Sequence, residues 1–194
     1  MFNDLSSPLS LLETRRSGKA REMTTPGPDA RQLRSILEIA TRTPDHGKLA
    51  PWRFIIIPDE HRKTLENVLK RAFLADKPEA TIAETNAMCG FISDAPTLVV
   101  LLSSPKREST IPLWEQELSV GAAAMNLLHA AHALGFVGSW ITAWPAFHNE
   151  VRNVFGNENQ RIAGFMFIGT PKGELQERPR PKYEDVVSIW QGEA

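Results

Sequence analysis

The stretch WEQELSVGAAAMNLLHAAHALGF, residues 114–136, limits the fold of this chain more than any other segment. It is rich in alanine and leucine and ends at Gly135, and glycine is a common residue at helix ends. Apolar residues lie on nearly every side of the helix that it predicts, so most of that helix must be buried. The small residues at 121–124 would let a second backbone approach closely. We therefore expect a central helix, with a composition that also suits a subunit interface.

The remaining pattern predicts a mixture of helices and strands. Apolar residues at helical spacing predict helices over 29–42 and 59–75, with Asp59 as the cap of the second. A third, short helix is expected over 147–155, and MTTPGPDA at 23–30 reads as a turn-rich link. Runs of β-branched and aromatic residues predict four strands, at 52–57, 97–102, 136–142 and 162–169. Spacing alone leaves a doubly wound sheet open as an alternative.

Length and composition favour one domain over residues 1–194, since 194 residues with 42% hydrophobic content can build one sizeable core. The segment after Gly169 is proline-rich and charged, yet it contains Val186, Val187, Ile189 and Trp190. Such an arm, about 171–194, needs a surface to cover its apolar side chains. In a chain of this length, that surface can belong to a second subunit.

Several classes of function are disfavoured. The net charge is −1, from 22 basic and 23 acidic side chains, so no overall field attracts nucleic acid or anionic membranes. Cys89 is the single cysteine, which excludes an internal disulfide and argues against a thiolate zinc site and a cysteine nucleophile. The N-terminal residues lack a secretory pattern, and no run of about 18 apolar residues occurs. We expect a soluble cytoplasmic protein.

Three basic clusters are candidates for binding an anion. TRRSGKAR, residues 14–21, carries Arg15, Arg16 and Ser17, and guanidinium and hydroxyl groups commonly surround phosphate. RPRPKYEDVV, residues 178–187, places Arg180 and Lys182 on one side of an extended segment. Taken singly, each of these two clusters is better explained as a solvated charged surface.

The second cluster, ATRTPDHGKLAPWRF at 40–54, lies between a predicted helix and a predicted strand. Arg42 and His46 could donate hydrogen bonds to an anion or to a polar ring. Asp45 and His46 could also begin a metal site, but no further ligand is marked, so no metal is expected. A plain turn built on Pro44 and Gly47 is the alternative. The usual fingerprints for dinucleotides, for phosphate loops and for a serine nucleophile are absent from the sequence.

These clusters, in this order, resemble the nitroreductase family of flavin enzymes. ETRRSGKAR, RTPDHGKLAPWRF, GFVGSWIT and IAGFMFIGTPKGE are similar to motifs of that family, and IPLWEQELSVGAAAMNLLHAAHALGF is similar to its YdjA-like subgroup. The resemblance implies an α+β, nitroreductase-like fold with a mainly antiparallel central sheet flanked by helices. It also implies a homodimer with two FMN sites at the interface and exchange of the C-terminal arms.

The resemblance also implies the site residues, position by position. Arg15, Arg16 and Ser17 match the motif that holds the FMN phosphate and ribityl chain, and Lys19 falls near the flavin N1 and O2 atoms. Arg42 and His46 would contact the cofactor in the other half of the dimer. The segment beside the flavin ring matches Trp140, Ile141 and Thr142. Arg180 and Lys182 would be phosphate ligands from the tail, and nicotinamide would stack near residues 131–136.

The implied function is that of an FMN-dependent NAD(P)H oxidoreductase. Hydride would pass from NAD(P)H to flavin N5 and then to a nitroaromatic, a quinone or a similar small acceptor, by a ping-pong mechanism. No catalytic side chain is named, because the flavin carries the chemistry. The alternatives are a non-catalytic FMN storage or sensor protein and another flavin-dependent reductase or dehydrogenase of the same superfamily; a nucleic-acid-binding role is least favoured. Neither the acceptor nor the choice between NADH and NADPH is readable from the sequence.

Overall fold

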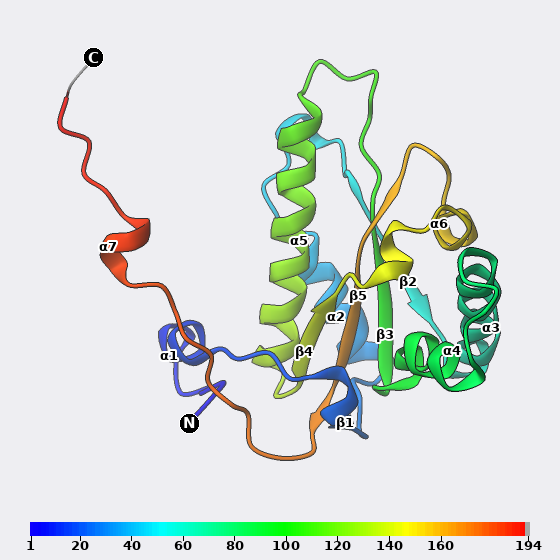
Figure 1. Cartoon of the computed structure of the whole chain (residues 1–194). Helices are drawn as coiled ribbons and strands as arrows, with labels where there is room; N and C mark the ends of the chain where they lie inside the picture. The colour runs from blue at the N-terminus through cyan, green and yellow to red at the C-terminus, as the bar shows by residue number, and fades with distance from the viewer. Residues whose placement is uncertain (193–194) are drawn as a thin grey trace.

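The computed structural model describes residues 1–192, and its centre is an antiparallel sheet of five strands (Figure 1). The strands are β1 (Met23–Thr24), β2 (Trp52–Ile57), β3 (Thr97–Ser103), β4 (Val137–Ile141) and β5 (Arg161–Pro171). Strand β5 pairs with β3 on one side and with β4 and β1 on the other, while β2 pairs with β3. Every pairing is antiparallel, so the expected antiparallel sheet is confirmed and the doubly wound alternative is wrong.

Helices cover both faces of the sheet. The longer helices are α2 (Ala30–Ala40), α3 (Asp59–Asp76), α4 (Ile82–Cys89) and α5 (Leu113–Ala133), and the shorter ones are α1 (Pro8–Thr14), α6 (Asn149–Phe155) and α7 (Tyr183–Val186). Figure 1 shows α5 and α2 over one face and α3, α4 and α6 beside the other. None of the helices within residues 1–192 is long and apolar enough to span a bilayer.

Strand β3 explains why two cores form. All seven of its residues are buried, as expected for an interior strand with both faces covered. Side chains alternate between the faces of a strand. Val99 and Leu101 accordingly pack with α2 and α5, whereas Leu98, Val100 and Leu102 pack with α3. The sheet is therefore held between two hydrophobic layers.

Helix α5 is the central helix that its sequence predicts. Its buried residues include Ala123, Ala124, Leu127 and Ala131, and they pack against the sheet and α2. The helix ends before Gly135, which has φ of 85° in the left-handed region that glycine adopts at little cost. The alanines allow α5 to lie close to the sheet.

Most other expected elements are confirmed, with local differences. Helix α2 begins with a capping box made by Asp29 and Gln32. In α3 the expected cap is wrong: Asp59 is the first helical residue, and Pro58 precedes it without a side-chain cap. Within the 23–30 link, Met23 and Thr24 form β1 because they pair with the end of β5.

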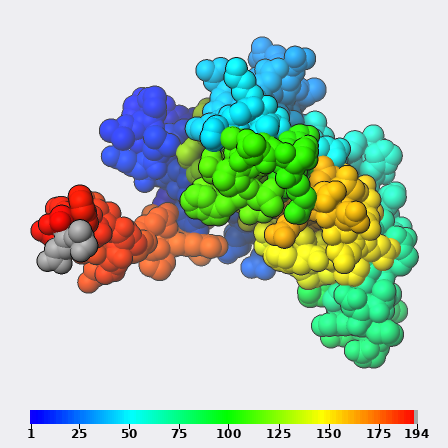
Figure 2. All heavy atoms as spheres, turned by 90° about the horizontal axis from the view of Figure 1, so that it is seen from above, coloured from blue at the N-terminus to red at the C-terminus, as the bar shows by residue number. Residues whose placement is uncertain are grey.

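The C-terminal segment leaves the body of the molecule. Figure 2 shows it projecting away from the globular part, and α7 lies on this arm. Ile189 and Trp190 are each 82% exposed. Large apolar side chains are rarely left in water without a partner surface. The expectation of an apolar arm is met in this chain, while its exchange with a second subunit and the single-domain assignment stay predictions.

Candidate functional site

A pocket of about 580 Å³ lies between the segment after α1, helix α5 and strand β4. We call it the site pocket. Six residues named from the sequence line it: Arg15, Arg16, Ser17, Lys19, Trp140 and Ile141. Its other lining residues are Gly18, Ala20, Arg21, Asp94, Met125, Leu128, Ser139 and Arg178. The first basic cluster and the strand that follows α5 therefore meet in one protomer.

The basic segment is fixed by two contacts that sequence patterns did not reveal. The Asn3 side chain accepts a hydrogen bond from the Arg16 N–H at 2.7 Å and donates to the Arg16 carbonyl at 3.2 Å. Gly18 lies directly on β4, where a Cβ atom would come within 2.9 Å of Val137 Cγ2. The absence of a side chain at Gly18 therefore lets the segment pack against the strand.

Positive charge is concentrated at one end of the site pocket. Arg16 is only 7% exposed, and its Nε donates to the Gln176 carbonyl at 2.7 Å. Burial lowers the pKa of Arg16, the neighbouring Arg178 and Arg180 lower it further, and Glu177 opposes them. Burial and then Arg180 lower the pKa of Arg15 in the same way. Burial and the neighbouring positive charges both disfavour the charged form of these arginines, and an anion bound beside them would favour it.

In one protomer the tail reaches the site pocket through Arg178. Arg178 lines the pocket, whereas Arg180 and Lys182 do not. The Arg180 guanidinium lies 3.2 Å from Glu177 and donates to the Arg178 carbonyl. Lys182 is exposed at the start of α7, where the arm has left the body. Basic residues alternate along this segment of the sequence, but nothing in a proline-rich extended segment marks where its contact with the globular part ends.

The site pocket also has apolar and aromatic lining residues. The Trp140 indole donates to the Ala163 carbonyl at 2.8 Å, and it occupies space over Gly164, where a Cβ atom would overlap the indole. Met125 and Leu128 of α5 also line the pocket. They were missed because α5 is apolar all round, so its periodicity does not single out a face. Thr142 follows β4, is exposed and does not line the pocket.

Arg42 and His46 lie elsewhere in the protomer. Both belong to the connection between α2 and β2, and neither lines the site pocket. His46 Nδ1 is 2.8 Å from the Glu115 carboxylate, at the start of α5. The two carboxylate oxygens of Asp45 accept hydrogen bonds from the Leu49 and Ala50 N–H groups, so this side chain closes the turn. A single protomer therefore separates the second cluster from the first and the third.

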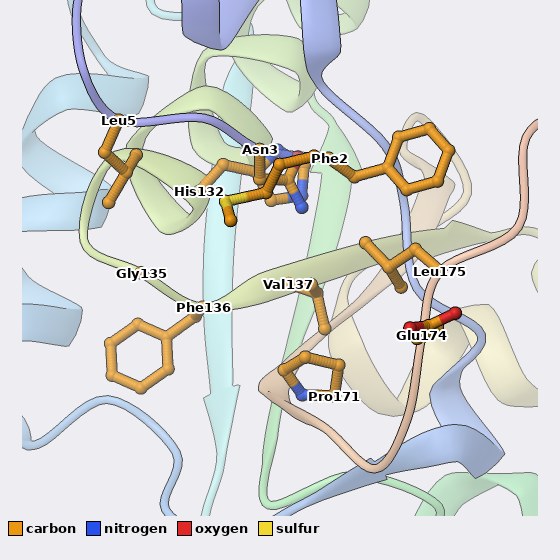
Figure 3. Close-up of a pocket in the computed structure, with 11 residues that line it drawn as sticks. Phe2, Asn3, Leu5, His132, Gly135, Phe136, Val137, Pro171, Glu174 and Leu175 are labelled. Carbon is orange, nitrogen blue, oxygen red and sulfur yellow. The ribbon is translucent and has the colours of Figure 1, made fainter.

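A second pocket, of about 600 Å³, lies where the N-terminal residues cross the end of α5 (Figure 3). His132 lines it and is fully buried, and its Nε2 accepts a hydrogen bond from the Gly138 N–H. Within residues 1–192, its Nδ1 has no hydrogen-bond partner. Burial, followed by the charges of Arg15 and His129, lowers the pKa of His132 to about 4. This pocket lies beside residues 131–136 but shares no lining residue with the site pocket.

Comparisons with known proteins agree with this architecture. Residues 12–170 match the sequence profile of the nitroreductase family. The chain is 34% identical over 165 residues to "Putative NAD(P)H nitroreductase YdjA" of Escherichia coli, which covers 84% of this chain and 88% of that protein.

Solved structures show the same fold. A nitroreductase-like family protein from Bacillus cereus superposes with a TM-score of 0.83 at 20% identity, over 96% of this chain and 97% of that one. A nitroreductase with bound FMN from Bacteroides fragilis superposes with a TM-score of 0.68 at 21% identity, over 94% and 98% of the two chains. The α+β arrangement, the profile match and the relative in Escherichia coli lead to one conclusion: this chain belongs to the nitroreductase family.

Proposed function

We propose that this chain is an FMN-dependent NAD(P)H oxidoreductase that reduces a small acceptor such as a nitroaromatic or a quinone. The observation that carries the proposal is the site pocket itself. Arg15, Arg16 and Arg178 all line it, although they come from opposite ends of the chain. Met125, Trp140 and Ile141 line it as well. An anionic group joined to a flat, largely apolar ring fits such a pocket, and FMN has this chemistry.

Different residues of the pocket would bind different parts of FMN. The guanidinium groups of Arg15 and Arg16 would hold the phosphate, because both line the pocket and guanidinium groups bind phosphate oxygens with two parallel hydrogen bonds. The backbone of β4 at Trp140 and Ile141 would align the ring. Lys19, whose Nζ lies 2.8 Å from Glu22, also lines the pocket and brings positive charge to it. Bound FMN supplies hydride transfer, while the protein binds it, orients it and excludes water.

A homodimer belongs to the same proposal. Trp114 and Leu118 lie one helical turn apart on α5 and are 68% and 53% exposed. With the small residues at 121–122, they form an exposed face that a second α5 could approach. Such pairing would bring Arg42 and His46 of a second copy towards the site pocket. Within one protomer, neither residue lines that pocket.

The arm has a candidate docking surface in the dimer. An apolar groove of about 580 Å³ runs along α2 and the edge strand β2, and Leu33, Leu37, Phe54 and Ile56 line it. Ile189 and Trp190 of a second copy are apolar and exposed, and so they match this groove in chemistry. An unpaired edge strand is also a common place for an additional segment to bind. A cytoplasmic location stays a prediction.

The experiment that tests the cofactor is an absorbance spectrum of the purified protein, with mass spectrometry of what it releases on denaturation. Flavin absorbance and the mass of FMN are expected. Arg16→Met should weaken FMN binding at least tenfold, because a hydrogen bond to a charged group contributes about 1.5–3 kcal/mol. Arg152→Met is the matched control, since Arg152 lies on α6 and donates to its neighbour Asn153. A protein that stays colourless after FMN is added would refute the proposal.

Turnover separates an enzyme from an FMN store or sensor. Steady-state oxidation of NADH and NADPH should be followed with a nitroaromatic and with a quinone as acceptor. Parallel lines in double-reciprocal plots are expected, because both substrates would use the same flavin face in turn. Binding of FMN without turnover for any acceptor would favour storage, and activity only with halogenated or peptide substrates would favour another reaction of the superfamily.

A further inference from the structure

The connection between α2 and β2, residues 42–50, has a strained backbone. Gly47, Lys48 and Ala50 have φ of 75°, 55° and 48°, all in the left-handed region. For Lys48 and Ala50, which carry a Cβ atom, this conformation is unfavourable. Such residues persist where surrounding contacts over-determine the backbone, and they are concentrated at functional sites. The contacts that hold this connection, which we call the 42–50 loop, are therefore informative.

Asp45 closes the strained part of the 42–50 loop. Its two carboxylate oxygens accept hydrogen bonds from the Leu49 N–H at 3.1 Å and from the Ala50 N–H at 2.8 Å. The Lys48 N–H donates to the Asp45 carbonyl at 3.2 Å. These bonds fix the turn itself, but they do not fix where the turn lies relative to the rest of the protein.

Helix α5 supplies the contacts that fix where the 42–50 loop lies relative to the rest of the protein. The Ser119 hydroxyl, which is almost completely buried, donates to the Pro44 carbonyl at 2.7 Å. The Asn126 amide donates to the Arg42 carbonyl at 3.3 Å and to the Thr43 hydroxyl at 2.8 Å. At the start of α5, the Glu115 carboxylate lies 2.8 Å from His46 Nδ1.

These three α5 residues are spaced at 4 and 7 positions, so they lie along one side of the helix. Each holds a different part of the 42–50 loop, and together they reach both of its candidate ligand residues. The same helix carries Met125 and Leu128 in the wall of the site pocket. One rigid element thus sets the position of the loop and one wall of the pocket.

We propose that Glu115, Ser119 and Asn126 are positioning residues that hold Arg42 and His46 ready to contact FMN bound in the site pocket of a second copy of this chain. The proposal rests on the proposed function and assigns to these residues no contact with the cofactor. A connection that only turned the chain would need neither the two strained residues, whose turn Asp45 closes, nor the polar contacts that α5 makes with residues 42–46. The affinity for FMN should therefore depend on side chains of α5 that do not line the site pocket.

The test compares Ser119→Ala with Ser119→Thr in the full-length protein, by two measurements. Hydrogen exchange of the 42–50 amides in FMN-free protein should become at least fivefold faster in Ser119→Ala. The dissociation constant for FMN, followed by quenching of flavin fluorescence, should rise about fivefold to tenfold, as expected for one lost hydrogen bond. Ser119→Thr keeps a hydroxyl and should restore most of the affinity.

Thr85→Val is the matched control, because Thr85 in α4 also loses a buried hydroxyl that donates to a backbone carbonyl, that of Thr81, at 2.9 Å. It should lower the melting temperature without changing the FMN dissociation constant. The proposal is overturned if Ser119→Ala and Thr85→Val change FMN binding equally, or if the loop amides stay equally protected in Ser119→Ala. If the wild-type chain binds no FMN, both the proposed function and the role of these residues in FMN binding are refuted. Hydrogen exchange of the loop amides then decides only whether α5 holds the 42–50 loop in place.

Discussion

Acid should destabilise this protein through His132, and the size of the effect follows from its surroundings. The imidazole is fully buried, and burial with nearby Arg15 and His129 lowers its pKa from 6.5 to about 4. The folded state therefore keeps His132 neutral at pH values where the unfolded chain already binds a proton. This contribution to stability is complete above pH 6.5 and is lost as the pH falls towards 4.

The two pKa values give the magnitude. Proton linkage predicts that the free energy of unfolding falls by about 2 kcal/mol at pH 5 and by about 3 kcal/mol at pH 4, relative to pH 7. His132→Gln is the informative variant, because its side-chain oxygen can still accept from the Gly138 N–H but does not titrate between pH 7 and 4. Carboxylates that also titrate in acid are common to both proteins, so they cancel in the difference.

The assay is urea unfolding at a fixed protein concentration, followed by tryptophan fluorescence at half-unit steps from pH 7 to 4. As the pH falls from 7 to 4, the free energy of unfolding of the wild type should fall relative to that of His132→Gln by about 3 kcal/mol in total. An NMR titration of the histidine ring gives an independent reading of its pKa. Equal pH dependence in the two proteins, or a ring that titrates near 6.5, would refute the reasoning.

Three further perturbations test the packing and the arm. Gly164→Ala should lower the free energy of unfolding by about 1–3 kcal/mol, because the new methyl group overlaps the Trp140 indole, and thermal denaturation should show a much smaller loss in a Trp140→Leu background. Arg62→Met should cost about 2–4 kcal/mol in urea unfolding, since the buried guanidinium donates to two backbone carbonyls, while exposed Lys63→Met should change little. Trp190→Ser should raise the dimer dissociation constant at least tenfold in analytical ultracentrifugation, and an unchanged constant would remove the arm from the interface.

Long apolar segments were the most predictable part of the fold. Strand β3 and helix α5 could be identified from the sequence, because an element buried on several sides is a nearly continuous run of apolar residues. The short helices α1 and α4 are marked in the sequence by their capping residues and not by an apolar pattern. Thr81 and Glu84 form a capping box at the start of α4, and Ser7 caps α1 just before Pro8. Strand β1 has no signal of its own, because its two residues are extended only through pairing with β5.

The site was predictable where a motif is local and less so where the chain has to be placed in space. Arg15, Arg16 and Ser17 could be named because they are adjacent in sequence and line one pocket. Arg178 could not be separated from Arg180, since nothing in an extended, proline-rich segment marks where it leaves the surface. Asn3 gave no signal, because its role depends on a contact with Arg16 across 13 positions. The roles proposed for Arg42 and His46 depend on the proposed homodimer, which a single sequence does not describe.

The connectivity of the sheet has a consequence for how the protein is made. Strand β5 is the last strand in chain order, yet it is the one that pairs with β1, β3 and β4. While the ribosome is still translating the residues before 161, β3 has only β2 beside it, and its apolar residues 98–102 are not yet covered by β5. Translation must therefore nearly finish before the nascent chain can complete its sheet.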